Sequence, residues 1–435
     1  MEIPPEFDVL ALPFQGHSTT ITKITYDHDE EELITGGMDG TIRIWNPLTK
    51  RQKIVFTAHH DYISQLILLS PKKQLISSSW DGKIIFWDLK QKRIAKIFDN
   101  SKPILDMVIS PSKQFLLISS EGKKTKLINT ETGKQISSLK GHKDEISVLS
   151  FSPDGKSFVS GSWDKTVKIW DLESKRPLNT IYLENEVSAI SFLDPFKIII
   201  GTWNGNVFLY DLEMQNITKK TKLHYNIVSQ ILFDKKNNYI LTVSADKTIK
   251  IVDPITLEEK YSLEDHKSRI FSIAISKDYI FSAGADKKIA IWDRRTLKKA
   301  DEILGRDNTV FQALLTPTAE YAQVLDSSGN ETFIDLKTLE IVSKPNVPFY
   351  SKEKLKGIMP IIIGHDGVSV RFNLKKLTSE QAKLAFVSLK ATIAKKYWVH
   401  INDHVYANLS QNQEISDNYY QKTEMLFKAL KKRFQ

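Results

Sequence analysis

Apolar and polar residues alternate along most of this chain in short runs, and each run ends at a tight turn. The segment from Ile146 to Trp170 illustrates the pattern: the runs ISVLSF, SFVS and TVKIW are separated by the turns PDG and WDK. Alternation with a period of two residues is typical of β-strands, and Asp-Gly or Asp-Lys turns are typical of the connections between them. The pattern predicts three short strands per unit, followed by a less regular fourth.

The unit repeats along the chain at a nearly constant spacing. Its turn positions, 40 to 43 residues apart, are Asp39, Asp81, Glu121, Asp164, Asn204, Asp246, Asp286 and Ser328. A period of about 40 to 45 residues is typical of one blade of a β-propeller. One four-stranded sheet of this size buries little surface by itself, so successive units are expected to stack face to face around an axis.

The stretch from Gly141 to Leu172, GHKDEISVLSFSPDGKSFVSGSWDKTVKIWDL, resembles the WD-repeat (WD40) family, with its Gly-His opening and Trp-Asp close. The resemblance continues in register from Gln15 to Leu336. It implies a buried hydrogen-bonded set of His, Ser or Thr, Asp and Trp in each well-matched blade. The predicted sets are His17, Thr35, Asp39 and Trp45; His59, Ser77, Asp81 and Trp87; His142, Ser160, Asp164 and Trp170; and His266, Ser282, Asp286 and Trp292. Unit six keeps His224, Thr242 and Asp246 but has Val252 in place of Trp, and units three, five and eight lack the His.

The number of blades follows less directly from the repeat. Eight units are clear, and a ninth strand pair follows over Ile361–Phe372. Near the N-terminus, residues 8–14 resemble a fourth strand without the first three, which suggests that this segment completes the last blade. We therefore expect an all-β fold, a single closed WD40 propeller over residues 1–373. Eight blades are predicted, with nine or seven as the alternatives.

Residues 374–435 change to a helical period and are predicted to form a basic α-helical extension. They contain ten Lys and one Arg against three Glu and two Asp, which accounts for most of the net charge of +9. The candidate tail contacts are Lys428, Lys431, Lys432 and Arg433. An amphipathic helix here could pack on the propeller, dock into a partner, or bind nucleic acid or an anionic membrane.

The His, Ser and Asp residues of the repeat are the residue types of a catalytic triad, but a triad occurs once, whereas this set recurs with the period of the blade. We interpret the sets as structural and predict no enzymatic activity and no cofactor. His400 and His404 would share one face of a helix, as zinc ligands do. Because no third ligand lies nearby, no metal site is predicted.

Five residues outside the sets are candidates for partner binding. Trp80, Trp163 and Trp203 directly precede a turn Asp or Asn, a position that the resemblance places on the top face around the central channel. Tyr62 and Arg269 resemble a second group of top-face positions. Since aromatic residues and Arg are enriched among interface hot spots, these residues predict a protein-binding surface. The alternative is that each Trp only packs on its neighbour.

Composition narrows the compartment and the class of function. The chain has no Cys, no N-terminal signal pattern and no apolar stretch long enough to span a membrane, which favours an intracellular, cytoplasmic protein that is not secreted. We predict a non-enzymatic scaffold that holds proteins together in a multisubunit assembly, with cytoskeletal and ciliary complexes among the candidates. The alternative is an RNA-binding or ribosome-associated subunit, although nucleic acid is the less favoured partner. No small-molecule substrate is expected.

Overall fold

The computed structural model describes residues 6–13, 16–57, 59–69, 73–305, 310–315, 321–326, 331–335, 340–345, 361–363, 367–373, 399–401 and 404–406. The regular elements within these ranges are all β-strands, which confirms the all-β class. In the same ranges, no helix has the length and apolar character needed to cross a membrane.

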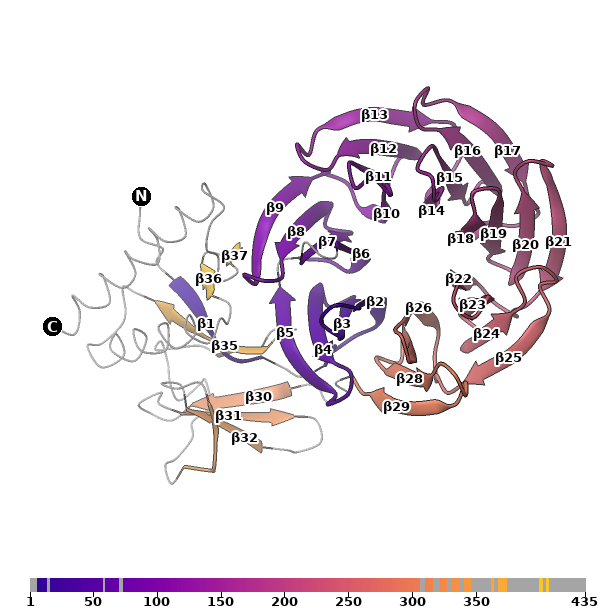
Figure 1. Ribbon diagram of the computed structural model, residues 1–435. Helices are drawn as coiled ribbons and strands as arrows, with labels where there is room; N and C mark the ends of the chain where they lie inside the picture. The colour runs from indigo at the N-terminus through magenta and orange to yellow at the C-terminus, as the bar shows by residue number, and fades with distance from the viewer. Residues whose placement is uncertain are drawn as a thin grey trace.

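Seven sheets of four antiparallel strands stand in a ring around a central axis, each built from four consecutive strands (Figure 1). Blade one holds β2 (Ile21–Asp27), β3 (Glu32–Gly37), β4 (Thr41–Asn46) and β5 (Arg51–Thr57); blade two β6 (Ile63–Leu69), β7 (Gln74–Ser79), β8 (Lys83–Asp88) and β9 (Arg93–Asp99); blade three β10 (Ile104–Ile109), β11 (Phe115–Ser120), β12 (Lys124–Asn129) and β13 (Gln135–Lys140); blade four β14 (Ile146–Phe151), β15 (Ser157–Ser162), β16 (Thr166–Asp171) and β17 (Pro177–Tyr182). Blade five holds β18 (Val187–Asp194), β19 (Lys197–Thr202), β20 (Asn206–Asp211) and β21 (Asn216–Lys222); blade six β22 (Val228–Asp234), β23 (Tyr239–Ser244), β24 (Thr248–Val252) and β25 (Glu259–Glu264); blade seven β26 (Ile270–Ile275), β27 (Tyr279–Gly284), β28 (Ile289–Asp293) and β29 (Lys299–Ile303).

The strand order gives the ring two different faces. The first strand of each blade lies nearest the central axis and the fourth lies on the rim (Figure 1). We call the top face the end where the turn between second and third strands meets the loop from the preceding blade. The bottom face, at the opposite end, carries the turns between first and second strands and between third and fourth strands.

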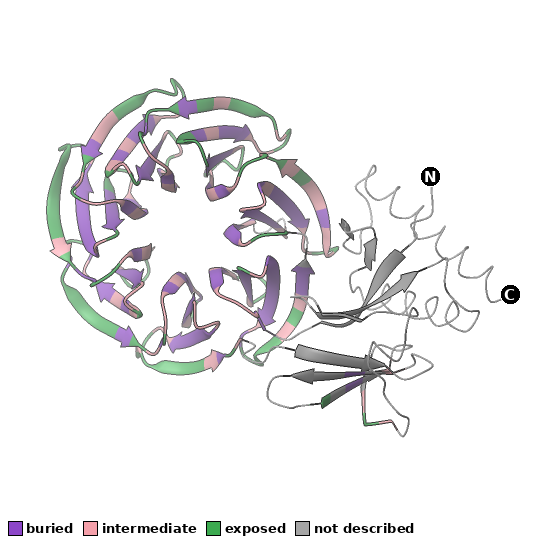
Figure 2. Ribbon diagram, turned by 180° about the vertical axis from the view of Figure 1, so that it is seen from behind, coloured by how far each residue is buried: buried purple, intermediate pink, exposed green. Residues whose placement is uncertain are grey.

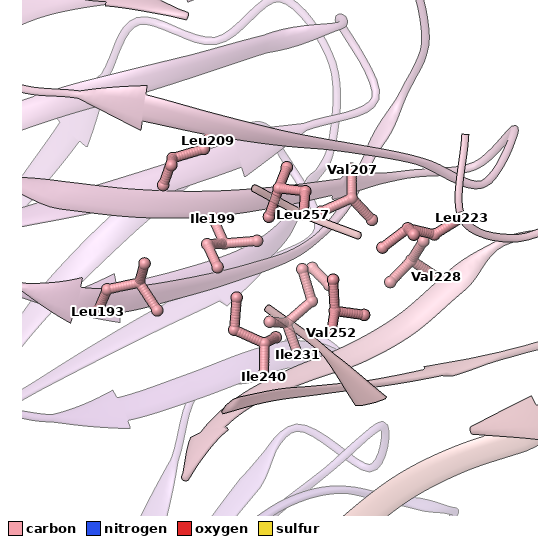
Figure 3. Close-up of a cluster of buried hydrophobic side chains, with 11 residues drawn as sticks. Leu193, Ile199, Val207, Leu209, Leu223, Val228, Ile231, Ile240, Val252 and Leu257 are labelled. Carbon is pink, nitrogen blue, oxygen red and sulfur yellow. The ribbon is translucent and has the colours of Figure 1, made fainter. Parts of the chain in front are cut away.

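Burial follows the same radial order. In Figure 2 the inner and middle strands are mostly buried, whereas the rim strands carry long exposed stretches. Between blades five and six, Leu193, Ile199, Leu209, Ile240 and Leu257 belong to one apolar cluster (Figure 3). Full burial of one such side chain contributes about 1.5–3 kcal/mol, so the interfaces between blades supply much of the stability.

The ring closes after seven blades, so the prediction of eight was wrong. Ile21 and Trp45 of blade one share a buried cluster with Phe281 and Ile291 of blade seven. At this closure, the Ile24 N–H donates to Ser272 Oγ (3.2 Å). A sequence repeat counts units, but the number that closes a ring depends on the angle between packed blades, which the repeat does not encode.

The N-terminal strand also differs from the prediction. It does not complete a blade of the ring, because β1 (Glu6–Pro13) pairs instead with β35 (Gly367–Asn373) and β36 (Val399–Ile401). Blades one and seven already contain their own fourth strands, so closure requires no strand from the other end of the chain.

The eighth and ninth units lie outside the ring (Figure 1). The eighth forms a separate sheet of β30 (Val310–Leu315), β31 (Tyr321–Asp326), β32 (Glu331–Asp335) and β33 (Glu340–Val342). The ninth supplies β34 (Ile361–Ile363) and β35 to a five-stranded sheet in the order β34-β35-β1-β36-β37, where β37 is His404–Tyr406. Within the predicted helical extension, residues 374–435, the structure describes only β36 and β37, which are paired strands and not helix; the rest lies outside the described residues.

Candidate functional site

Blade four contains a buried chain of four polar side chains that joins its strands to its top-face turn. Trp170 Nε1 lies 2.8 Å from Ser160 Oγ, and Ser160 Oγ lies 2.7 Å from His142 Nε2. At the other side of the imidazole ring, His142 Nδ1 lies 2.9 Å from the carboxylate of Asp164. The set therefore fastens the second and third strands to the loop and turn of the top face.

Burial and hydrogen bonding set the protonation states of His142 and Asp164 in this set. Burial lowers the pKa of His142 and outweighs the attraction of Asp164, so the imidazole is neutral near pH 7. For Asp164, burial alone would raise the pKa, but hydrogen bonds from Thr166, the Lys143 N–H and His142 lower it. A neutral imidazole has one donor and one acceptor nitrogen. Trp170 thus donates to Ser160, Ser160 to His142, and His142 to Asp164.

The same four groups meet in three other blades. The sets are His17, Thr35, Asp39 and Trp45; His59, Ser77, Asp81 and Trp87; and His266, Ser282, Asp286 and Trp292. In blade six, His224 lies 2.9 Å from both Thr242 and Asp246, and Val252 occupies the Trp position. In the complete sets each Ser or Thr hydroxyl is buried between an imidazole and an indole, so it is not placed to attack a substrate.

The turns that follow the second strands hold the predicted tryptophans on the top face. Asp164 accepts hydrogen bonds from the Thr166 N–H (2.9 Å) and hydroxyl (2.6 Å), which closes the turn after Trp163. In blade five, Gly205 adopts a φ of 85°, and a Cβ there would clash with the His224 backbone. Both turns thereby leave the Trp side chain at the surface.

The three predicted tryptophans do not form one patch. Trp163 and Trp203 meet edge to face, with ring centroids 5.6 Å apart, and remain 37% and 39% exposed. Trp80 instead packs on Tyr62, with ring centroids 4.5 Å apart, and is more buried than the other two tryptophans. Burial raises the pKa of the Tyr62 phenol. Arg269 lies over the Phe271 ring at 4.3 Å.

Two exposed tyrosines that the sequence analysis missed flank the blade-four and blade-five turns. Tyr182, 79% exposed, ends β17 opposite Thr166, directly beside the turn of Trp163. Tyr225, 89% exposed, follows His224, whose N–H donates to Gly205 O in the turn of Trp203 (3.1 Å). The sequence could have identified both by position: Tyr182 ends a fourth strand, and Tyr225 directly follows the His of a polar set. We call these four residues, Trp163, Tyr182, Trp203 and Tyr225, the aromatic surface.

The repeat itself is recognised by comparison with known families. The model for the WD domain, G-beta repeat (WD40), matches residues 9–46, 50–88, 133–171, 216–253 and 257–293. The five matches cover the first three strands of blades one, two, four, six and seven, the blades that contain a buried His in a hydrogen-bonded set. The chain is a WD40-repeat β-propeller. The intervals 89–132 and 172–215 hold most of the strands of WD40 blades three and five, which lack the His.

Two relatives of this WD40 propeller carry the same functional name. The chain is 34% identical over 139 residues to the ribosome biogenesis protein WDR12 homolog of Drosophila erecta, covering 28% of this chain and 33% of the relative. With the homolog of Drosophila persimilis it is 30% identical over 146 residues, covering 30% and 35%. The chain thus spans about a third of the length of the curated relatives it matches.

The described part of the WD40 chain places none of the remaining predicted residues in a site. His400 and His404 lie on β36 and β37, two paired strands, and not on one helix. Among the residues that the structure describes, no group of three or more His, Asp and Glu could hold a metal ion. Lys428, Lys431, Lys432 and Arg433 lie outside the described residues.

Proposed function

We propose that this WD40 propeller is a non-catalytic subunit of a ribosome-assembly particle and binds a protein of that particle through the aromatic surface. The observation that carries the proposal is the similarity to ribosome biogenesis proteins of the WDR12 type. It favours the ribonucleoprotein role over the cytoskeletal or ciliary scaffold.

The geometry of blades four to six supports a protein partner. Trp163, Tyr182, Trp203 and Tyr225 together present large, partly exposed rings on one face. Tyr and Trp supply much contact area at a low cost in conformational entropy, and they dominate binding energy at many interfaces. The Asp-capped turn and Gly205 hold the two tryptophans before a partner arrives, which lowers the entropy lost on binding.

The absence of a catalytic role is also part of the proposal. The polar groups that resemble a catalytic triad are engaged in hydrogen bonds within the blades, and the set recurs with the repeat. A propeller of this kind would act by positioning its partners.

The test is affinity purification of the tagged full-length chain from cells of its own organism, followed by gradient sedimentation and RNA sequencing. We expect co-sedimentation with precursor ribosomal RNA and a defined set of proteins. The W163A/W203A variant should lose at least one of these proteins. The matched control is F196A, which removes an exposed ring from the bottom face of blade five, where Phe196 is 50% exposed.

Two results would contradict the proposal. Sedimentation of the wild-type chain with no ribosomal precursor would exclude the assembly role. Retention of every protein by W163A/W203A, with the variant folded by circular dichroism, would exclude the aromatic surface as the docking site.

A further inference from the structure

A groove of about 730 Å³ lies on the bottom face between blades six and seven and has a basic lining. Its carboxylates are Asp278 and Asp293 only. Its cationic residues are Lys236, Lys260, Lys277, Arg294 and Arg295. They come from the turns after β22, β26 and β28 and from β25, so the fold gathers positive charge from four separate segments.

One of these cations builds the groove. Arg294 donates from Nε to Asp234 (2.8 Å) and from a terminal nitrogen to Ser276 O (2.6 Å). The first bond ties the last turn of blade seven to the first turn of blade six. The walls of the groove are therefore held in place without a ligand.

The other four cations of the groove differ in whether they form an ion pair. Lys260 pairs with Asp253 at 2.7 Å. The side chains of Lys236, Lys277 and Arg295, in contrast, are exposed and have no hydrogen bond or ion pair within the part of the chain that the structure describes. They are free to contact an anionic ligand.

The groove also offers a ring and amide groups. Tyr261 on the rim strand is 57% exposed, and Asn237 and Asn238 of the turn after β22 also line the groove. An exposed ring among Lys and Arg side chains is the combination found where proteins bind single-stranded nucleic acid, because the cations neutralise phosphates and the ring stacks on a base.

The equivalent groove between blades two and three shows that the repeat does not require this chemistry. It has nearly the same volume, about 740 Å³, but its charged lining residues are Lys96, Lys113 and Glu131. Lys96 Nζ donates to the Glu131 carbonyl (2.7 Å). The groove between blades two and three thus does not share the positive charge of the groove between blades six and seven.

We propose that the groove between blades six and seven binds single-stranded RNA, with Lys236, Lys277 and Arg295 on phosphates and Tyr261 stacked on a base. An acidic peptide would use the cations but would leave the Tyr261 ring without a stacking partner. A groove of this volume holds only a short piece of strand. The inference rests on the proposed function, since a ribosome-assembly particle supplies such RNA.

The experiment measures binding of a fluorescein-labelled oligouridylate to the purified full chain by anisotropy, at about 50 and 200 mM KCl. We expect K236E/K277E/R295E to weaken binding at least about tenfold and to flatten the salt dependence, because each phosphate contact on a single strand contributes about 0.7 to the logarithmic slope. The control K90E/K134E/K175E makes an equal charge change on the bottom face outside the groove. It should stay within about twofold of the wild type.

Tyr261 tests the stacking. Y261A should weaken binding about 5- to 100-fold, the effect of removing one base–ring stack, whereas Y261F should bind like the wild type. Equal losses in the two charge-reversal variants, wild-type affinity in Y261A, or displacement of the RNA by polyglutamate more readily than by unlabelled RNA would each overturn the proposal.

The two proposals fail separately. If the purified chain binds RNA through the groove but never sediments with ribosomal precursors in cells, only the proposed function fails. If the chain sediments with these particles and the purified protein binds no RNA, only the groove proposal fails.

Discussion

Blades four and five are neighbours with the same fold and different interiors. Where blade four has the buried Ser160 and Trp170, the strand register of blade five places Ile200 and Tyr210. Blade five has no His, and Ile200 is fully buried in an apolar cluster shared with blade four. Blade three resembles blade five, because it has the apolar residues Ile118 and Ile128 at these positions.

The difference shows that the polar set is kept or replaced largely as a unit. A buried donor or acceptor that loses its partner costs about 1–3 kcal/mol, whereas replacing both partners by apolar groups can be nearly neutral. Blade six is the intermediate case: Val252 replaces the Trp, and Thr242 still lies 2.9 Å from His224. The removal of Trp leaves no orphan donor, because the donor itself is gone.

The largest loss of stability is expected when a polar group is introduced into the interior of blade five. Ile200→Ser removes buried apolar volume and adds a hydroxyl with no His or Trp to pair with, so we expect a loss of about 3–5 kcal/mol in the free energy of unfolding. Urea denaturation followed by tryptophan fluorescence measures it. Ile200→Val, the control, should cost about 0.5–1.5 kcal/mol; equal midpoints for the two variants would contradict the comparison.

The reverse change in blade four is expected to cost slightly less. Ser160→Ala leaves both Trp170 Nε1 and His142 Nε2 without their partner, which predicts a loss of about 2–4 kcal/mol. The matched control is Ser160→Thr, because blades one and six carry Thr35 and Thr242 at this position. If the Ala and Thr variants unfold at the same urea concentration, the hydroxyl does not support the set.

Acid should weaken blades one and four, which contain His17 and His142. Burial lowers the pKa of His142 and His17, so the unfolded chain binds protons that these folded imidazoles do not. Their contribution is present above the ordinary His pKa of about 6.5 and falls below it, by at most about 1.4 kcal/mol per pH unit for each His. Because the pKa of Asp164 is lowered, the loss of stability continues below about pH 4.

Urea midpoints between about pH 5 and 8 would test this dependence. His142→Gln should flatten the slope between about pH 5 and 6.5 relative to the wild type. An unchanged slope would show that His142 does not carry the dependence.

The smallest effect concerns the two rings that link these blades at the surface. A double-mutant cycle with Trp163→Ala and Trp203→Ala should give a coupling energy of about 0.5–1.5 kcal/mol, the usual value for an aromatic pair. Trp80 packs on Tyr62, so Trp80→Ala and Trp163→Ala should be additive within about 0.5 kcal/mol. If Trp163→Ala and Trp203→Ala are additive, the edge-to-face contact contributes nothing to stability.

The buried polar sets were predictable from the sequence because each lies within one repeat. His142, Ser160, Asp164 and Trp170 fall within one repeat, and the recurrence of their spacing was enough to predict which residues would be neighbours. The separation of Trp80 from the pair of Trp163 and Trp203 was not predictable, because it depends on which blades are adjacent and on the packing of Trp80 against Tyr62. The basic groove was missed for the same reason, since its cations come from four segments of two blades.

The sequence by itself determined the blade: strand alternation, turn residues and the polar sets are all encoded within about 40 residues and act through short-range contacts. Only the tertiary structure decided that seven blades close the ring and that β1 pairs with β35 and β36. Both outcomes depend on contacts between segments far apart in the chain, such as the stacked rings of Tyr26 and Phe281. Such contacts are selected by packing angles and shape, and a periodic pattern of residues does not specify either.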